Sequence, residues 1–362
     1  MKPQRRIALS LGINFDTRTR FEFYSDLKKE GEDVVPAVNP VFLLKRGSIP
    51  DHEEPLFSVG GISDKTTVGA NENGYFMKFK SDRFGFNNPD SEWDSEEIDW
   101  LLIGDSFANG VAVKQNESIA GKIRSMTKKS AITLGIPSNG PLVELASLKE
   151  YAKIVKPKIV LWLYYEGNDL TTNLKREKSV NILQKYLNEG FNQNLVARQN
   201  EIDKRLLKYV RTKEDEKKIN RNIKKGKLLW ILSLLKLSHV RRILHLEVNY
   251  SEGNVYVDPL FSKILKVANN EVLQMGGKMY FVYLPEYSRY KLGVLDHDKY
   301  RKRKEVLDAV AELNIPIIDL HKELFSKQND PLALFPFGLP GHYNEKGYKK
   351  VTEIIIQEIP GF

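Results

Sequence analysis

The fold of this chain is indicated most directly by Ile98–Ala108, which reads IDWLLIGDSFA. The apolar run at its start predicts a buried strand, and Ser106 then lies in the turn where a helix begins. Open α/β sheets place their chemistry at such strand ends. A helix that begins after the serine directs free N–H groups toward an oxyanion forming there. Taken alone, a Gly-Asp-Ser triplet fits a helix N-cap as well as a nucleophile.

Three later segments repeat this arrangement of a polar residue beside a strand end or helix start. The run Lys158–Tyr165 predicts a second buried strand, and Glu166-Gly167-Asn168-Asp169 follows it. A glycine-containing turn, Leu134–Pro141, follows another short apolar stretch. His342 precedes a C-terminal helix that has a regular apolar face. The chain therefore presents a serine, a glycine-containing turn, an asparagine and a late histidine in that order.

These four segments resemble the sequence blocks of the GDSL/SGNH hydrolase family, over roughly residues 96–360. The resemblance implies that Ser106 is the nucleophile and His342 the general base. A serine hydroxyl needs such a base, and histidine serves near neutral pH. The resemblance also implies an oxyanion hole made by the N–H of Ser106, the turn at Ser138 and Gly140, and the Asn168 amide. It implies no cofactor and no metal, and we read Asp105 and Asp169 as structural.

The chain departs from the family pattern before the histidine. An aspartate usually lies three positions ahead of it and orients the imidazole, but here the residue is Leu339. Either His342 works as a dyad held by a backbone carbonyl, or another acid such as Asp330 takes this place. Glu345, one helical turn on, is the less favoured orienting acid. In the glycine block, Ser138 aligns with the donor glycine, and Gly140 follows two residues later.

The segment Ser81–Pro89, SDRFGFNNP, predicts a turn rich in polar and aromatic residues. It is either a packed hairpin or the border of the active cleft, with Arg83 and its aromatic neighbours binding a sugar ring. Together with Tyr164–Leu170, it resembles SGNH-like proteins encoded with bacterial surface polysaccharide machinery. This implies a serine esterase for O-acyl, most simply O-acetyl, groups of a surface glycan. An O-acetyltransferase using the same acyl-enzyme and a non-catalytic glycan-binding or assembly factor remain alternatives.

Five apolar runs separated by helical patterns predict a three-layer α/β/α sandwich with a mostly parallel, flavodoxin-like sheet. We expect an N-terminal extension (1–95) packed on an SGNH-like domain (96–362) with a helical insertion at about 171–265. The five expected strands are 98–103, 131–134, 158–165, 278–284 and 316–319. Helices are expected at 21–29, 142–154 and 300–313, and a further strand at 75–80.

The charge of the chain is concentrated in one segment. The 362 residues carry a formal net charge of +9, and residues 203–242 hold fourteen Lys and Arg against four acids. This segment, with the apolar run Leu228–Leu237, is either a helical cap on the core or a peripheral contact with anionic lipid. Too few aromatics interleave with the basic residues for nucleic-acid binding.

Other features bound the location and the chemistry. The sequence contains no cysteine, P-loop or dinucleotide fingerprint, which excludes disulfides and argues against ATP or NAD. The basic start and short apolar run at 1–13 make a poor signal peptide and could be the remnant of a membrane anchor. We expect a bacterial cell envelope or periplasmic protein, with the cytoplasm left open.

Overall fold

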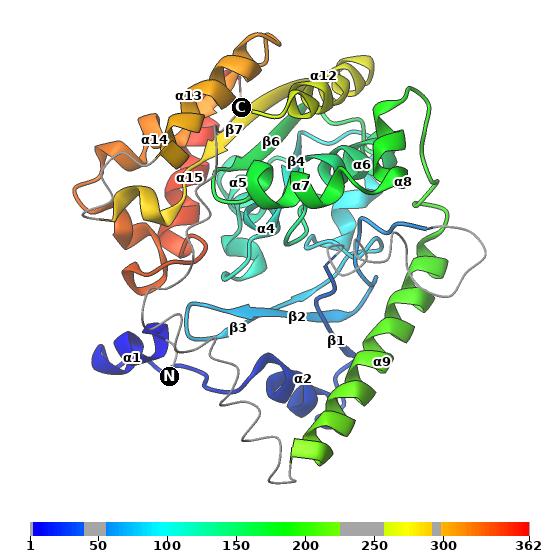
Figure 1. The fold of residues 1–362 in the computed structure, drawn as a ribbon, viewed down its shortest axis with the longest axis vertical. Helices are drawn as coiled ribbons and strands as arrows, with labels where there is room; N and C mark the ends of the chain where they lie inside the picture. Colours follow the sequence, from blue (N-terminus) through cyan, green and yellow to red (C-terminus); the bar gives the residue numbers. More distant parts are fainter. Residues whose placement is uncertain (1–2, 40–55, 225–256, 292–297, 362) are drawn as a thin grey trace.

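The structure is a computed structural model that describes residues 3–39, 56–224, 257–291 and 298–361. Its main sheet has five parallel strands in the order β5-β4-β6-β7-β8 (Figure 1). The strands are β4 (Trp100–Gly104), β5 (Ala131–Thr133), β6 (Ile159–Tyr165), β7 (Lys278–Leu284) and β8 (Ile317–Asp319). The predicted parallel α/β sheet is confirmed, and each strand begins within two residues of its expected start.

Both faces of this sheet are buried, because successive strand residues point to opposite sides and most of them are apolar. In β4, Leu101 and Ile103 join one core, while Trp100 and Leu102 join the other. Helices α6 (Pro141–Tyr151), α12 (Pro259–Gln274) and α13 (Asp298–Ala311) contribute to the first core. Helices α5 (Ile119–Thr127) and α15 (Glu345–Glu358) cover the second. The outcome is the expected three-layer sandwich.

The strand order places a topological switch point beside β4. The chain passes from β4 to β5 on one side and then returns across to β6 on the other. In sequence order this is 2-1-3-4-5, the flavodoxin-like arrangement, in which ligands bind at the carboxyl end of the first strand. The turn that carries Ser106 follows directly from that end.

A second, three-stranded sheet belongs to the N-terminal part and lies below the sandwich in Figure 1. In it, β1 (Val34–Pro36) runs parallel to β2 (Thr66–Asn71), and β2 pairs antiparallel with β3 (Phe76–Lys80). Helix α2 (Arg20–Lys29) packs on this sheet, and α1 (Pro3–Ser10) precedes it. We call residues 3–39 and 56–98 the N-terminal layer. Several of its side chains lie in the same core as α6, including Phe57, Phe86 and Trp93.

Between β6 and β7 lie α7 (Leu174–Glu177), α8 (Asn181–Gln184) and the long α9 (Gln199–Lys224). Ile202, Leu206 and Val210 of α9 are buried in the main core, and Glu214 accepts a hydrogen bond from Tyr24 of α2. The part of the basic segment up to Glu214 therefore packs against the protein. Its apolar run, Leu228–Leu237, lies outside the described residues. Within the described residues, no helix is long and apolar enough to cross a bilayer.

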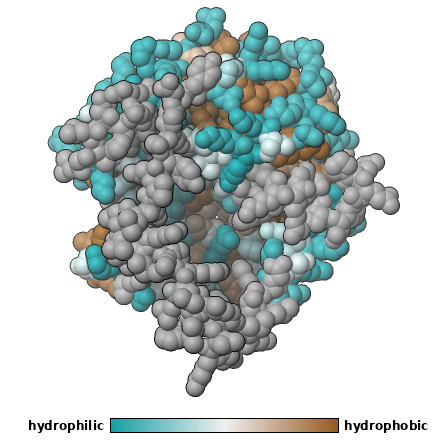
Figure 2. Space-filling model, in the orientation of Figure 1, coloured by the Kyte–Doolittle hydropathy of each residue, from teal (hydrophilic) through white to brown (hydrophobic). Residues whose placement is uncertain are grey.

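Short helices complete the sandwich. They are α4 (Ser106–Asn109), which follows β4, and α14 (Leu320–Glu323), which follows β8. On the face shown in Figure 2, hydrophilic residues cover most of the visible sandwich, and apolar residues appear between them in small patches. This is the ordinary surface of a folded globular protein.

Candidate active site

Ser106 is held where β4 passes into α4. Asp105 is the N-cap of this helix, and its carboxylate accepts a hydrogen bond from the Phe107 N–H at 2.9 Å. Gly104 allows the close approach of β6, because a Cβ there would lie 2.9 Å from the Leu163 carbonyl oxygen. Ser106 is only 7% exposed, and what surface it has faces a cavity. The turn therefore fixes the serine hydroxyl at the floor of a pocket.

His342 reaches this serine from the segment that precedes α15. Its Nε2 lies 2.7 Å from Ser106 Oγ, within hydrogen-bond distance. Two contacts hold this segment in place. Phe107 packs against the imidazole with ring centroids 4.8 Å apart, and the buried Tyr343 donates its hydroxyl to the Pro285 carbonyl at 2.9 Å. The two residues expected to form the nucleophile and base are thus brought together.

Glu72, in the turn between β2 and β3, supplies the carboxylate that contacts His342. Its two oxygens lie 3.0 and 3.1 Å from His342 Nδ1. One of them also accepts the backbone N–H of His342 at 2.8 Å. A carboxylate at Nδ1 holds the proton on that nitrogen and leaves Nε2 to accept from the serine hydroxyl. Ser106, His342 and Glu72 therefore form a triad in geometry, assembled from two layers of the molecule.

The surroundings of His342 shift its pKa upward. Burial lowers the pKa of the imidazole, but the negative charge and hydrogen bond of Glu72, aided by Asp105, raise it by more. A raised pKa strengthens the ring as a proton acceptor. Asp105 itself, fully buried, has its pKa raised by burial, against a hydrogen bond from the Phe107 N–H that lowers it. The imidazole is thus more basic than a free histidine side chain.

The structure does not bring Asp330 to the histidine. Its carboxylate accepts from the Leu332 N–H at 3.1 Å and caps the short turn Pro331–Leu334. Glu345 accepts the hydroxyl of Tyr75 at 2.8 Å. In place of an acid at position 339, Glu72 contacts the histidine from 270 positions before it in the sequence. Its only signal in the sequence was a single acid in the polar turn Asn71–Gly74, ahead of an expected strand.

Three groups that could hold an oxyanion face the same cavity. Ser106, Ser138 and Asn168 all line it. The N–H groups of Ser106 and Ser138 donate to no other group in the described part of the chain. Ser138 has a φ of +72°, a region that glycine favours, in keeping with its alignment to the glycine block. The side-chain Oδ1 of Asn168 accepts from Asn173 Nδ2 at 3.1 Å, so its amide N–H groups lie on the other side, where the Asn168 side chain also interacts with Asp105.

The expectation for Gly140 is wrong. Its N–H donates to Glu177 at 2.6 Å, because Gly140 is the N-cap of α6 and this helix end is satisfied by the Glu177 carboxylate. The expectation for Asp169 holds in its contacts, since it accepts the Tyr165 N–H at 2.7 Å and braces the turn that carries Asn168. Asp105 caps α4 as expected.

The cavity beside the triad has a volume of about 290 Å³. Apolar or small side chains of both layers form most of its wall. They include Val35, Val38, Ile62, Met77, Phe79, Val111 and Ile136. Arg83 is not among the lining residues, since it pairs with Asp90 and Asp94 at the edge of the N-terminal layer. Of the two interpretations of Ser81–Pro89, the structure agrees with a packed turn and not with the border of the cleft. Asp82 in this segment is fully buried and accepts hydrogen bonds from Asn88 and Trp93.

No group of three or more His, Asp or Glu side chains in the described residues could hold a metal ion. A serine, a histidine and a carboxylate in this contact could perform acyl transfer, with the residues acting as nucleophile, base and orienting acid.

Some solved structures are similar to part of this chain. No family model and no curated protein matches the chain. A solved structure described as a lipolytic protein of the G-D-S-L family, from Desulfitobacterium hafniense DCB-2, is 14% identical, covers 73% of this chain and 100% of its own, and has a TM-score of 0.39. A lipase/acylhydrolase from Enterococcus faecalis is 17% identical, with 73% and 96% coverage and a TM-score of 0.40. An acetyl xylan esterase is 12% identical, with 72% and 100% coverage and a TM-score of 0.38. Because these superpositions are partial, the assignment of the site rests on the geometry of its own residues.

Proposed function

We propose that this protein is a serine esterase that removes O-acyl groups, most simply acetyl groups, from a glycan. One observation carries the proposal, the contact chain from Ser106 Oγ through His342 to Glu72 at the floor of a cavity. Nucleophile, base and orienting acid lie within hydrogen-bond reach of one another, which is the arrangement that activates a serine.

In the proposed reaction, Ser106 Oγ attacks the ester carbonyl as its proton passes to His342 Nε2. The Oγ–C bond forms and the carbonyl oxygen becomes an oxyanion, held by the N–H groups of Ser106 and Ser138 and the Asn168 amide. Collapse breaks the bond to the sugar oxygen, which takes the proton from His342 and leaves as an alcohol. Water, deprotonated by the same histidine, then attacks the acyl-enzyme and releases the acid together with free Ser106.

The walls of the cavity suit a small apolar acyl group. Val111 and Ile136 accompany Ser106 and Asn168 in its lining, and neither side chain offers a hydrogen-bonding group. The proposed glycan rests on the resemblance of Tyr164–Leu170 and Ser81–Pro89 to proteins of surface polysaccharide systems, although Ser81–Pro89 itself packs away from the cavity. Leu339, at the usual position of the orienting aspartate, favours a non-catalytic factor, but the contact of Glu72 with His342 supplies a carboxylate and supports an enzyme.

The test is release of acetate from 4-nitrophenyl acetate and from an acetylated oligosaccharide. We expect turnover by the wild type and loss of about 10³-fold or more in Ser106→Ala. Ser125→Ala, which alters an exposed serine of α5, is the matched control and should keep full activity. Undiminished turnover by Ser106→Ala, or none by the wild type on any acyl ester, contradicts the proposal. Transfer of acetyl to added sugar without comparable hydrolysis would instead identify an O-acetyltransferase.

A further inference from the structure

Arg20, the first residue of α2, places a permanent positive charge at the cavity that holds the triad. It lines this cavity together with Ser106, His342 and Asn168. No Asp, Glu or Lys is among the described residues that line it. Among the described residues that line the cavity, Arg20 is the one side chain with a permanent charge, so its guanidinium can distinguish charged from neutral substrates.

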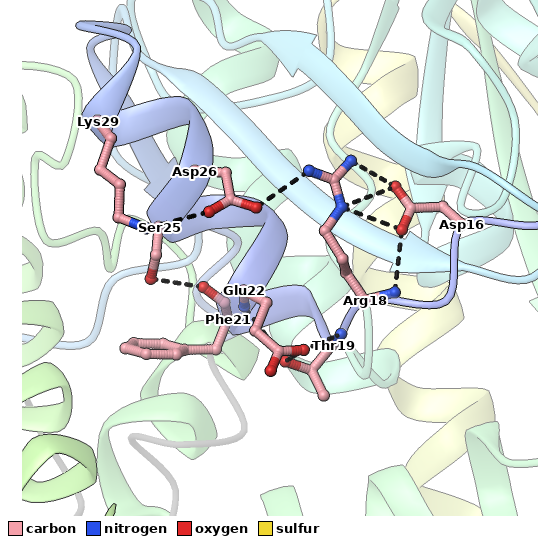
Figure 3. A network of polar contacts seen from close by, with 8 residues as sticks. All are labelled: Asp16, Arg18, Thr19, Phe21, Glu22, Ser25, Asp26 and Lys29. Carbon is pink, nitrogen blue, oxygen red and sulfur yellow. Dashed lines mark hydrogen bonds and ion pairs between the residues drawn. The ribbon is translucent and has the colours of Figure 1, made fainter.

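Figure 3 shows that the acids of the segments on either side of position 20, Asp16, Glu22 and Asp26, are in contact with other residues. Arg18 binds Asp16 at 2.7 Å and Asp26 at 3.1 Å. Lys29 binds Asp26 at 3.3 Å. Arg20 itself makes no hydrogen bond or ion pair with any residue in the described ranges. The cation that faces the cavity is thus the one left without a counter-ion in this network.

The backbone that carries Arg20 is fixed. Thr19 caps α2, with its hydroxyl accepting the Glu22 N–H at 3.2 Å and its own N–H donating to Glu22 at 2.8 Å. Position 20 is therefore pre-organised, and only the side chain of Arg20 must be ordered by a ligand. Although much of this side chain is accessible, desolvation by the surrounding protein lowers its pKa. An anion bound there would offset that cost.

Arg20 lies at the rim of the cavity. It also lines two neighbouring depressions, neither of which includes Ser106 or His342. One of these runs along Tyr24 and Tyr209 between α2 and α9. A group bound to Arg20 would therefore belong to the part of the substrate that extends out of the acyl site.

We propose that Arg20 binds a carboxylate of the glycan, so that the preferred substrate is an O-acylated acidic sugar of the uronic acid type. The inference rests on the proposed esterase function and names its substrate class. A guanidinium matches a carboxylate with two parallel N–H···O bonds, and a single such residue neutralises a single negative charge. A phosphate group is the competing anion, and the experiment separates the two.

The experiment compares an O-acetylated oligogalacturonate with its methyl ester, which carries the same acetyl groups without the charge. For the wild type we expect kcat/KM about 10–100-fold higher on the acid, the range of a charge-assisted bidentate pair. Arg20→Gln should remove this preference by slowing the acid alone, and Arg20→Lys should restore part of it. Lys29→Gln is the matched control, since it removes one charge from the same helix without touching the cavity.

A binding measurement separates this inference from the function on which it rests. In a Ser106→Ala background, deacetylated oligogalacturonate should bind, and the added Arg20→Gln change should weaken it by the same factor. If the protein hydrolyses 4-nitrophenyl acetate but shows no preference for the acidic oligosaccharide, the inference about Arg20 is wrong and the esterase function is unaffected. If no ester is hydrolysed, the proposed esterase function is wrong. Equal slowing of both substrates by Arg20→Gln would make Arg20 structural. Inhibition by inorganic phosphate that Arg20→Gln relieves, with no acid preference, would assign the site to phosphate.

Discussion

At the scale of single residues, Glu72 fixes the histidine from a different layer of the molecule than the one that carries Ser106. The sequence predicted Ser106 and His342 because each lies beside a strong strand or helix signal. It could not predict Glu72, since the contact spans 270 positions and depends on how the N-terminal layer packs. Periodicity places residues within elements, while such long-range pairs follow from tertiary packing.

Glu72→Gln tests whether this carboxylate orients and charges the imidazole. We expect kcat to fall by about 10²–10⁴-fold, because a neutral amide can hold the wrong tautomer and cannot stabilise an imidazolium. Asp330→Asn is the matched control and should stay within a few-fold of wild type. Equal losses in both variants would show that Glu72 has no special place. The measurement is kcat on 4-nitrophenyl acetate with folding checked by circular dichroism.

The same variant has a predicted pH signature. His342 must be neutral to act as base, so kcat/KM should fall as pH drops through its pKa, which Glu72 holds above the ordinary 6.5. Removing the negative charge lowers that pKa, and the acidic limb of the profile should move to lower pH in Glu72→Gln. A limb that stays in place, or moves up, would contradict the assignment of Glu72 as the charge beside His342.

Asn168→Ala tests the oxyanion donor. Its amide N–H groups point away from Asn173, and its side chain lines the cavity with Ser106. Loss of one such donor costs about 10²–10³-fold in kcat with little change in KM, because the bond forms only in the transition state. Asn194→Ala, in an exposed turn, is the control. A KM effect with unchanged kcat would mean that Asn168 binds the ground state instead.

At the scale of elements, the buried carboxylate of Glu177 caps α6 and explains why Gly140 is unavailable to an oxyanion. It accepts the N–H groups of Gly140 at 2.6 Å, Leu142 at 3.0 Å and Val143 at 3.4 Å. The strand and helix starts were readable from apolar runs and from Pro141 at the first helical position. The sequence did not predict that Glu177 caps this helix, because α7 lies beside the start of α6 only in the folded chain.

Glu177→Ala should therefore destabilise the protein by about 2–3 kcal/mol by leaving three buried N–H groups unsatisfied. Burial raises the pKa of Glu177 to about 8, against the three N–H bonds that lower it. A carboxyl group whose pKa is higher in the folded than in the unfolded protein stabilises the folded state at low pH. This stabilisation is lost as the pH rises from about 4.5 to about 8. The deficit of Glu177→Ala in urea unfolding should thus be larger at pH 5 than at pH 8. Glu189→Ala, exposed in the same region, should show neither effect.

At the scale of the whole molecule, the N-terminal layer is part of the proposed active site. It gives Glu72 to the triad and Val35, Met77 and Phe79 to the wall of the cavity. The parallel sheet could be predicted because its strands are continuous apolar runs buried on both faces. The placement of this layer could not, because its strands are short and pair among themselves.

Phe86→Ala tests whether the two layers unfold as one. Phe86 is fully buried and meets Tyr151 of α6 edge-on, with centroids 5.1 Å apart, so it belongs to a core shared by both layers. Truncation should cost about 3–5 kcal/mol, whereas Leu273→Ala, at a 58% exposed position, should stay within about 0.5 kcal/mol.

Because the core is shared, hydrogen exchange in Phe86→Ala should lose protection in β2–β3 and in β6 to the same extent. Esterase activity should disappear in that same transition, since detaching the layer removes Glu72 from His342. If β2–β3 instead opened while β6 kept its protection, the layer would be a separate folding unit. Activity would then be governed by how often that unit is docked, which a kcat proportional to the docked fraction, obtained from the free energy of β2–β3 opening, would reveal.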